Sequence, residues 1–178
     1  MKQIILKTGE TLKIRKAKSE DAQNVLNFTN KACGETDFLT FGPGEFLLTV
    51  EQEQQFLESI DKLNNAVYLV GEIDGQIIGT ASFVGGSRPR IAHTGEFGMC
   101  ILKEHWGKGI GTELLKYLMD YTRSTGIIRK LNLRVRADNL PAIHLYKKLG
   151  FAECGRITRE VNVKGKFHDS ILMEYEIE

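Results

Sequence analysis

Three glycines spaced two residues apart, Gly107, Gly109 and Gly111, mark the segment of this sequence that is best suited to chemistry. They follow an apolar stretch that ends at Leu102, and they lead into a helix-like pattern near Thr112. Glycine has no Cβ, so a ligand can approach the backbone of such a turn closely. The first N–H groups of a helix lack intrahelical partners, and the helix dipole adds positive potential there. The segment therefore predicts a site for an anion such as a phosphate or a pyrophosphate.

Two common phosphate-binding motifs do not fit this segment. In a Walker A loop the lysine follows the last glycine, whereas Lys108 precedes the last two glycines here. A Rossmann loop needs glycine where this chain has Thr112, and it needs an acidic residue about 20 positions later. No acidic residue occurs between Asp120 and Asp138, so a dinucleotide-binding loop is excluded.

The segment from Trp106 to Gly111 instead resembles the acyl-CoA loop of the GNAT superfamily of N-acetyltransferases, Arg/Gln-x-x-Gly-x-Gly/Ala, with tryptophan replacing the usual Arg or Gln. A second GNAT signature, Asn-x-x-Ala-x-x-Leu/Phe-Tyr-x-x-x-Gly-Phe, is matched from Asn139 to Phe151. The two signatures occur in the family's order, and the resemblance covers most of the chain from about Ala66 onward. It implies a GNAT fold and acetyl-CoA as co-substrate.

The resemblance also implies which residues bind the coenzyme. The strand backbone would pair with the pantetheine arm, and the glycine loop would hold the diphosphate. The residues so implied are Met99, Cys100, Ile101, Trp106, Gly107, Lys108, Gly109, Ile110, Gly111, Thr112, Asn139 and Tyr146. Further candidates for contact with the pyrophosphate or the 3′-phosphate are Arg88, Arg90 and Lys103.

Acetyl transfer from a thioester to an amine requires the amine to lose a proton and the departing thiolate to gain one. Glu96 is the expected base, directly or through a water, because it is the only carboxylate on the strand before the glycine loop and shares a face with Gly98 and Cys100. His93 is an alternative base. Tyr146 matches the family tyrosine near the coenzyme sulfur and is the expected general acid. Cys100 is expected to be a small packing residue, which favours direct transfer in a ternary complex over an acetyl-enzyme.

The rest of the pattern predicts the elements that position these residues. Ser19 is expected to cap one helix, Thr49 and Gln52 to form the capping box of the next, and Asp138 or Asn139 to cap a short helix before Gly150. The expected strands are 12–18, 67–73, 76–84, 92–102, 129–136, 151–162 and 167–176, and the expected helices are 19–31, one from 49, 109–124 and 139–149. This order agrees with the GNAT fold, which is a mixed, mostly antiparallel sheet with a central parallel pair and flanking helices.

The composition narrows the class of protein. The chain is expected to form one N-acetyltransferase domain over 1–178, and its net charge of +1 argues against a basic nucleic-acid-binding surface. It has no long apolar run, so no membrane span is expected. Its three cysteines include no CxxC pair, which favours a reducing cytoplasm and no bound metal.

The acceptor is expected across the sheet from the coenzyme, lined by the 34–48 loop, the 85–92 loop and the final hairpin. The 34–48 loop carries acids that could attract an amine and aromatic rings that could form apolar walls: Glu35, Asp37, Glu45, Phe38, Phe41 and Phe46. A primary amine of a small molecule or amino acid is the leading substrate. The alternatives are a protein N-terminus of the ribosomal-protein type or a lysine, and a non-catalytic acyl-CoA-binding module. A homodimer is compatible with the sequence.

Overall fold

The computed structural model describes residues 1–178. Its strands are β1 (Lys2–Ile5), β2 (Thr11–Lys16), β3 (Ala66–Ile73), β4 (Gln76–Gly85), β5 (Thr94–Ile101), β6 (Lys130–Arg136), β7 (Ala152–Val163) and β8 (Lys166–Glu176). Its helices are α1 (Ala22–Glu35), α2 (Val50–Asp61), α3 (Ile110–Ser124) and α4 (Leu140–Lys148), with short 3₁₀ turns η1 (Ser19–Asp21) and η2 (Lys103–His105). No helix is long and apolar enough to cross a membrane.

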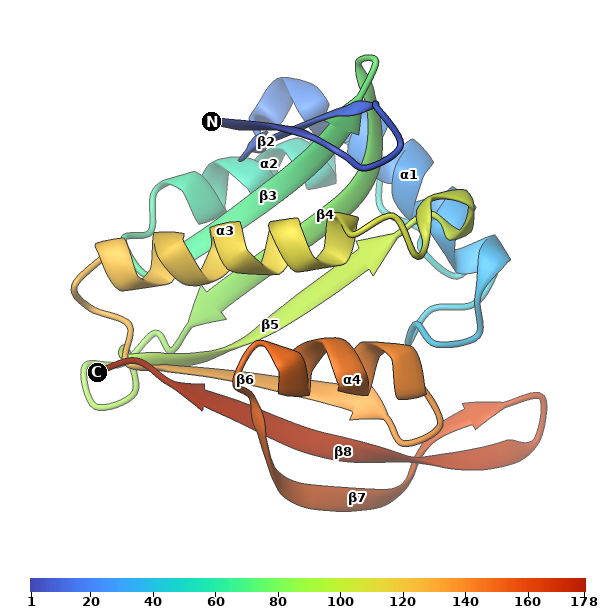
Figure 1. Cartoon of the computed structure of the whole chain (residues 1–178), viewed down its shortest axis with the longest axis vertical. Helices are drawn as coiled ribbons and strands as arrows, with labels where there is room; N and C mark the ends of the chain where they lie inside the picture. The colour runs from blue at the N-terminus through green and yellow to red at the C-terminus, as the bar shows by residue number, and fades with distance from the viewer.

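All strands form one sheet in the order β1-β2-β3-β4-β5-β6-β8-β7. The pairs are antiparallel except for the central β5–β6 pair. Helices α3 and α4 cover one face of the sheet, and α1 and α2 cover the other (Figure 1). The predicted fold class, a mixed sheet with one central parallel pair and flanking helices, is confirmed.

Two apolar layers hold the helices on the sheet. The larger layer lies under α3 and α4, where Ile110, Leu114 and Leu118 form an apolar stripe that is almost completely buried. The smaller layer lies under α1 and α2 and includes Phe28 and Leu57. Because alternate strand residues point to opposite faces, the central strands β3, β4 and β5 supply both layers.

The central parallel pair is short, and this shapes the site. β5 pairs with β6 only where Thr94–Glu96 lies beside Lys130–Asn132, whereas its pairing with β4 continues to Ile101. Beyond Glu96 the two parallel strands diverge. The β5 edge from Phe97 to Ile101 therefore has no strand beside it, and a gap opens in the middle of the sheet.

Several predicted boundaries are confirmed by local geometry. Thr49 and Gln52 form the reciprocal capping box of α2, and the side chain of Asn139 accepts a hydrogen bond from the N–H of Ala142 at the start of α4. Gly126 and Gly150 follow α3 and α4 with positive φ angles of 66° and 94°. These conformations favour glycine and end the helices.

Other boundaries differ from the sequence prediction. β1 was not predicted from the sequence; it is an edge strand held by its pairing with β2. The first helix begins as the η1 turn and extends to Glu35 rather than stopping near Lys31. The strand expected from residue 92 begins at Thr94, because turn hydrogen bonds such as the one from the Thr94 N–H to the Ile91 carbonyl occupy the preceding residues.

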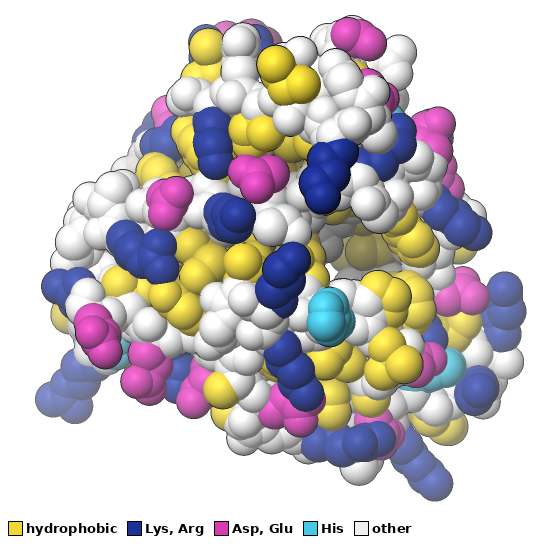
Figure 2. Space-filling model, viewed as in Figure 1, with side chains coloured by type: hydrophobic (Ala, Val, Ile, Leu, Met, Phe, Trp, Pro, Cys, Tyr) yellow, Lys and Arg dark blue, Asp and Glu magenta, His cyan; other side chains and the backbone are white.

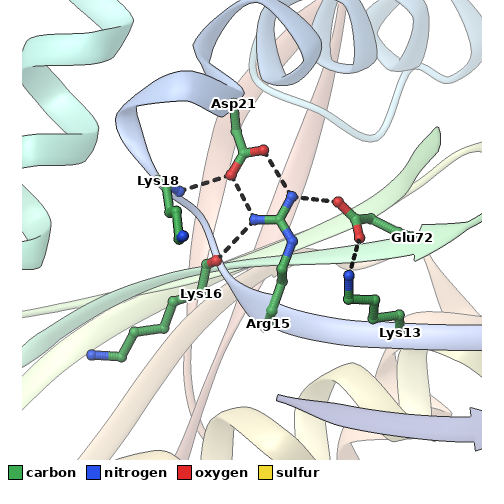
Figure 3. Close-up of polar contacts among 6 residues, drawn as sticks. All are labelled: Lys13, Arg15, Lys16, Lys18, Asp21 and Glu72. Carbon is green, nitrogen blue, oxygen red and sulfur yellow. Dashed lines mark hydrogen bonds and ion pairs between the residues drawn. The ribbon is translucent and has the colours of Figure 1, made fainter. Parts of the chain in front are cut away.

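A network of charged side chains fixes the start of α1 to the sheet (Figure 3). Arg15 on β2 donates two hydrogen bonds to Asp21 at 2.6 and 2.7 Å, and it also contacts Glu72 on β3. Lys13 lies 3.7 Å from the other oxygen of Glu72. The hydrogen bonds from Arg15 lower the pKa of Asp21 below its ordinary value. The network therefore joins two strands to the turn that leads into α1.

Candidate active site

The glycine segment forms a tight loop between η2 and α3. Gly107 and Gly109 have φ angles of 75° and 85°, a left-handed conformation that glycine adopts without strain. None of the backbone N–H groups from Gly107 to Thr112 donates a hydrogen bond within the chain. The first one that does belongs to Glu113, which bonds to the carbonyl of Gly109 at 3.2 Å. This row of free donors at the start of a helix is suited to a multiply charged anion.

Trp106 closes this loop against the strand that precedes it. Its indole Nε1 donates a hydrogen bond of 2.7 Å to the carbonyl of Ile101, the last residue of β5. The residue that departs from the usual Arg or Gln thus links loop and strand within the chain. Half of its surface stays exposed, and its expected contact with the coenzyme stays a prediction.

The basic residues near the loop differ in their surroundings. Lys108 lies 3.3 Å from a carboxylate oxygen of Glu10, so part of its charge is already compensated. Arg88 and Arg90 lie in the connection between β4 and β5, at the opposite end of β5 from the glycine loop. A strand rises about 3.3 Å per residue, so the length of β5 separates them from the loop. These two arginines therefore lie too far away to contact a diphosphate bound at the glycine loop, and their contact with the 3′-phosphate stays a prediction.

Tyr146 approaches the gap between β5 and β6 from α4. Its ring packs edge-on against Phe97, with centroids 5.7 Å apart, and Phe97 is the first β5 residue beyond the paired segment. Only 7% of Tyr146 is exposed, and its hydroxyl forms no hydrogen bond within the chain. Burial raises the pKa of Tyr146 to about 12, with a smaller contribution from Cys100. The phenol therefore keeps its proton at neutral pH.

Glu96 lies on the other face of β5, at the last position paired with β6. Its carboxylate accepts hydrogen bonds of 3.0 and 3.2 Å from the guanidinium of Arg134, and the same guanidinium donates one of 2.9 Å to Glu160. Neither Arg134 nor Glu160 was predicted as a site residue. The alternation of basic and apolar residues along β6 could have indicated that Arg134 faces the same side as Glu96.

The connection between α1 and α2 is fastened over β6 by a second arginine. Arg136 is 9% exposed and donates a hydrogen bond of 2.6 Å to the carbonyl of Asp37. Its guanidinium lies 4.8 Å from the ring centre of Phe38 and also pairs with Asp138 at 2.7 Å. This arginine lowers the pKa of Asp138 to about 2. His168 of β8 contacts the same carboxylate at 3.2 Å, so the predicted acceptor loop and the final hairpin meet here.

The surface over the gap is hollowed. Figure 2 shows a depression between the start of α3 and α4, in the same view as Figure 1. The glycine loop leads into the start of α3 at one end of it, and α4, which carries Tyr146, borders the other side. The opposite face of the gap carries Glu96 and Gly98. A long ligand bound along the hollow could thus present its end to groups on both faces of the sheet.

Comparison with known proteins identifies the family. The family model described as Acetyltransferase (GNAT) family matches residues 36–151. The chain belongs to the GNAT acetyltransferase family. It is therefore an acetyl-CoA-dependent N-acetyltransferase, and the sequence resemblance drawn from the two signatures is confirmed.

Individual GNAT relatives differ in their acceptors. Spermidine N(1)-acetyltransferase of Escherichia coli is 31% identical over 129 residues, which are 69% of this chain and 68% of that protein. The N-alpha-acetyltransferase of Sulfurisphaera tokodaii is 28% identical over 175 residues, 94% of each chain. A GNAT acetyltransferase structure from Streptococcus pneumoniae superposes with a TM-score of 0.91 at 34% identity, covering 93% of this chain and 99% of that one. These comparisons establish the fold and the type of reaction and leave the acceptor open.

Proposed function

We propose that this enzyme transfers the acetyl group of acetyl-CoA to a primary amine of a small molecule or an amino acid. The observation that carries the proposal is the row of free N–H groups from Gly107 to Thr112, which ends beside a gap in the sheet. A diphosphate held there would direct the pantetheine arm along the open edge of β5. Backbone groups of Met99 and Ile101 would pair with its amides as an added strand does.

In the proposed mechanism, two side chains act from opposite faces of the gap. Glu96 accepts the proton of the amine, directly or through a water, and Arg134 keeps its carboxylate oriented. Tyr146 donates its proton to the departing thiolate, a role that requires the protonated phenol that its raised pKa preserves. The free amine attacks the thioester directly, and the C–S bond breaks as the thiolate leaves.

The surroundings of Cys100 support direct transfer over an acetyl-enzyme. Burial raises the pKa of Cys100 to about 12, and the nearby thiol of Cys33 contributes to this shift. A nucleophilic cysteine needs a thiolate, which usually requires a lowered pKa. Cys100 lacks that activation, and its role in the proposal is to pack beneath α1.

A protein N-terminus is the second candidate acceptor. The nearly full-length similarity to an N-alpha-acetyltransferase favours it, as do apolar side chains exposed on the α1–α2 connection, such as Phe41 and Leu47. A peptide could lie across such side chains, whereas a small amine needs only the floor of the site.

The proposal is tested by thiol release from acetyl-CoA across a panel of amines, amino acids and N-terminal peptides. Efficient turnover with small amines supports the first candidate, and turnover only with peptides supports the second. Acetyl-CoA binding without thiol release in the presence of any acceptor would refute the proposed acetyl transfer at this site.

A further inference from the structure

One buried carboxylate in this chain lacks a partner. Glu53 lies on the face of α2 that also buries Leu57 and Ile60, and it is only 2% exposed. No hydrogen bond or ion pair reaches its carboxylate, and burial alone raises its pKa above the ordinary value. Glu72, by contrast, is 9% exposed and is paired with Arg15 and Lys13. Burying an unpaired carboxylate is costly, so its presence needs a reason.

The small exposed area of Glu53 belongs to its carboxylate. No side-chain oxygen that is fully shielded from solvent lacks a hydrogen-bond partner anywhere in the chain. Since the oxygens of Glu53 have no partner, they must retain some access to solvent. The apolar stem is therefore covered by the protein, while the charged end keeps slight access to solvent.

Glu53 reaches the face of the sheet that α1 and α2 cover. Tyr68 of β3 packs edge-on against Phe56 of α2 at 6.1 Å, and the charge of Glu53 acts on its hydroxyl. Across the strands Tyr68 pairs with Ser82, and Ser82 pairs with Gly98. The three residues form one row on the face that also carries Glu96. Glu53 thus lies above one end of a row whose other end borders the gap.

At the Gly98 end of this row the surface of the sheet is open. A Cβ added to Gly98 would meet nothing closer than the hydroxyl of Ser82 at 3.9 Å. Neighbouring strands lie about 4.8 Å apart, so Tyr68 and Gly98 are about 10 Å apart, or two strand spacings. An amine positioned over Gly98 for transfer could therefore extend the rest of its molecule toward Glu53.

The charges around this row favour a cationic ligand. Glu96 and Glu160 share the single guanidinium of Arg134, which leaves that group with a net negative charge. At the other end Glu53 adds a carboxylate with no cation beside it. The basic residue Arg136 is already paired with Asp138. Both ends of the row thus offer negative charge.

We propose that Glu53 binds a second, positively charged nitrogen of the acceptor, which makes aliphatic diamines and polyamines the preferred substrate class. This inference rests on the proposed amine acetylation and specifies its acceptor. One nitrogen reacts over Gly98 while the other pairs with Glu53, which replaces the missing partner of the carboxylate. Glu53 is a specificity residue in this proposal and takes no part in proton transfer.

The test compares diaminohexane with hexylamine, which differ in the second amine. Thiol-release kinetics should show a wild-type preference for the diamine in kcat/KM of at least tenfold. Glu53→Gln should raise KM for diaminohexane by roughly tenfold to a hundredfold, the range expected for a buried charge-assisted hydrogen bond, with little change in kcat. Its kinetics with hexylamine should match the wild type. Glu51→Gln, on the exposed side of the same helix, is the matched control and should change neither substrate.

The outcomes separate this inference from the proposed function. Equal wild-type kinetics with both amines, or a diamine preference retained by Glu53→Gln, would overturn the role of Glu53 while amine acetylation stands. An equal loss of kcat with both amines in a variant that unfolds at or above the wild-type temperature would also overturn it, since Glu53 would then act in catalysis. Thiol release from no amine at all would refute the proposed function and the inference with it.

Discussion

Substitution of one loop glycine separates the cost of backbone strain from the loss of coenzyme binding. Gly109 precedes α3 with a φ angle of 85°, and an added Cβ would meet no atom of the chain within 4 Å. Gly126 follows the same helix with a φ angle of 66° and an equally open Cβ position. Alanine at either position therefore costs conformational strain without a steric clash. Only the methyl group at Gly109 would enter the space from which an anion reaches the free N–H groups.

The expected magnitudes follow from these facts. A left-handed alanine costs about 1–2 kcal/mol, so Gly109→Ala and Gly126→Ala should each lower the unfolding temperature by about 2–8 °C. Loss of one charge-assisted hydrogen bond to the diphosphate costs about 1.5–3 kcal/mol. Gly109→Ala should therefore weaken acetyl-CoA binding by roughly ten- to a hundredfold, whereas Gly126→Ala should leave the affinity unchanged.

The assay is calorimetric titration of acetyl-CoA into each folded variant, together with thermal unfolding of the free proteins. Similar unfolding temperatures with a large difference in affinity would support the loop as the diphosphate site. The reasoning would be refuted if Gly109→Ala bound acetyl-CoA as tightly as the wild type, or if Gly126→Ala lost as much affinity.

Further predictions concern catalysis and stability. Tyr146→Phe should lower kcat by about a hundredfold or more, as expected for loss of a general acid. Its acetyl-CoA affinity should be unchanged and its stability nearly so, because the hydroxyl has no partner in the chain. Full activity in thiol release would exclude Tyr146 from the mechanism. Glu96→Gln should lower kcat similarly, and a variant with wild-type turnover across the pH range would exclude Glu96 as the base. Arg15→Met should lower the free energy of unfolding by about 2–4 kcal/mol at pH 7, because Asp21 loses its arginine partner and Glu72 keeps only Lys13. Since the folded pKa of Asp21 is lowered, its pairing stabilises the protein above its ordinary pKa of 3.8, and this stabilisation is lost as the pH falls through the folded value. The free energies of unfolding of wild type and variant should therefore converge in acid. A difference in unfolding free energy that stays constant with pH would contradict the network. Glu53→Gln should unfold at a higher temperature than the wild type at pH 8, because a raised folded pKa means that the carboxylate destabilises the fold above its ordinary pKa of 4.5. The difference in unfolding temperature should vanish below that pH. A variant less stable than the wild type at pH 8 would show that the charge of Glu53 is already compensated in the free enzyme.

Much of the fold could be predicted because its signals are local. Helix ends are set by neighbouring residues alone. Examples are the capping box of Thr49 and Gln52 and the glycines at 126 and 150, which the structure has as expected. β1 could not be predicted in this way. It is a short edge strand that depends on pairing with β2, a contact that its own residues do not encode.

The same difference between local and long-range signals decides which site residues could be predicted. The glycine loop and Tyr146 lie within continuous motifs, so the sequence could indicate both. The partners Arg134 and Glu160 of Glu96 come from separate strands, and only the sheet order brings them together. Arg88 and Arg90 lie far from the glycine loop for a related reason, since basic residues that precede the loop in sequence can lie at the far end of a strand. Glu53 could not be distinguished from the exposed acids of α2 until its burial was known.

A crystal structure of the enzyme with acetyl-CoA would test the central claim most directly. The diphosphate should accept hydrogen bonds from the N–H groups between Gly107 and Thr112, and the thioester should lie in the gap between β5 and β6 beside the hydroxyl of Tyr146. A coenzyme whose diphosphate binds elsewhere, or whose thioester lies away from that gap, would contradict the account.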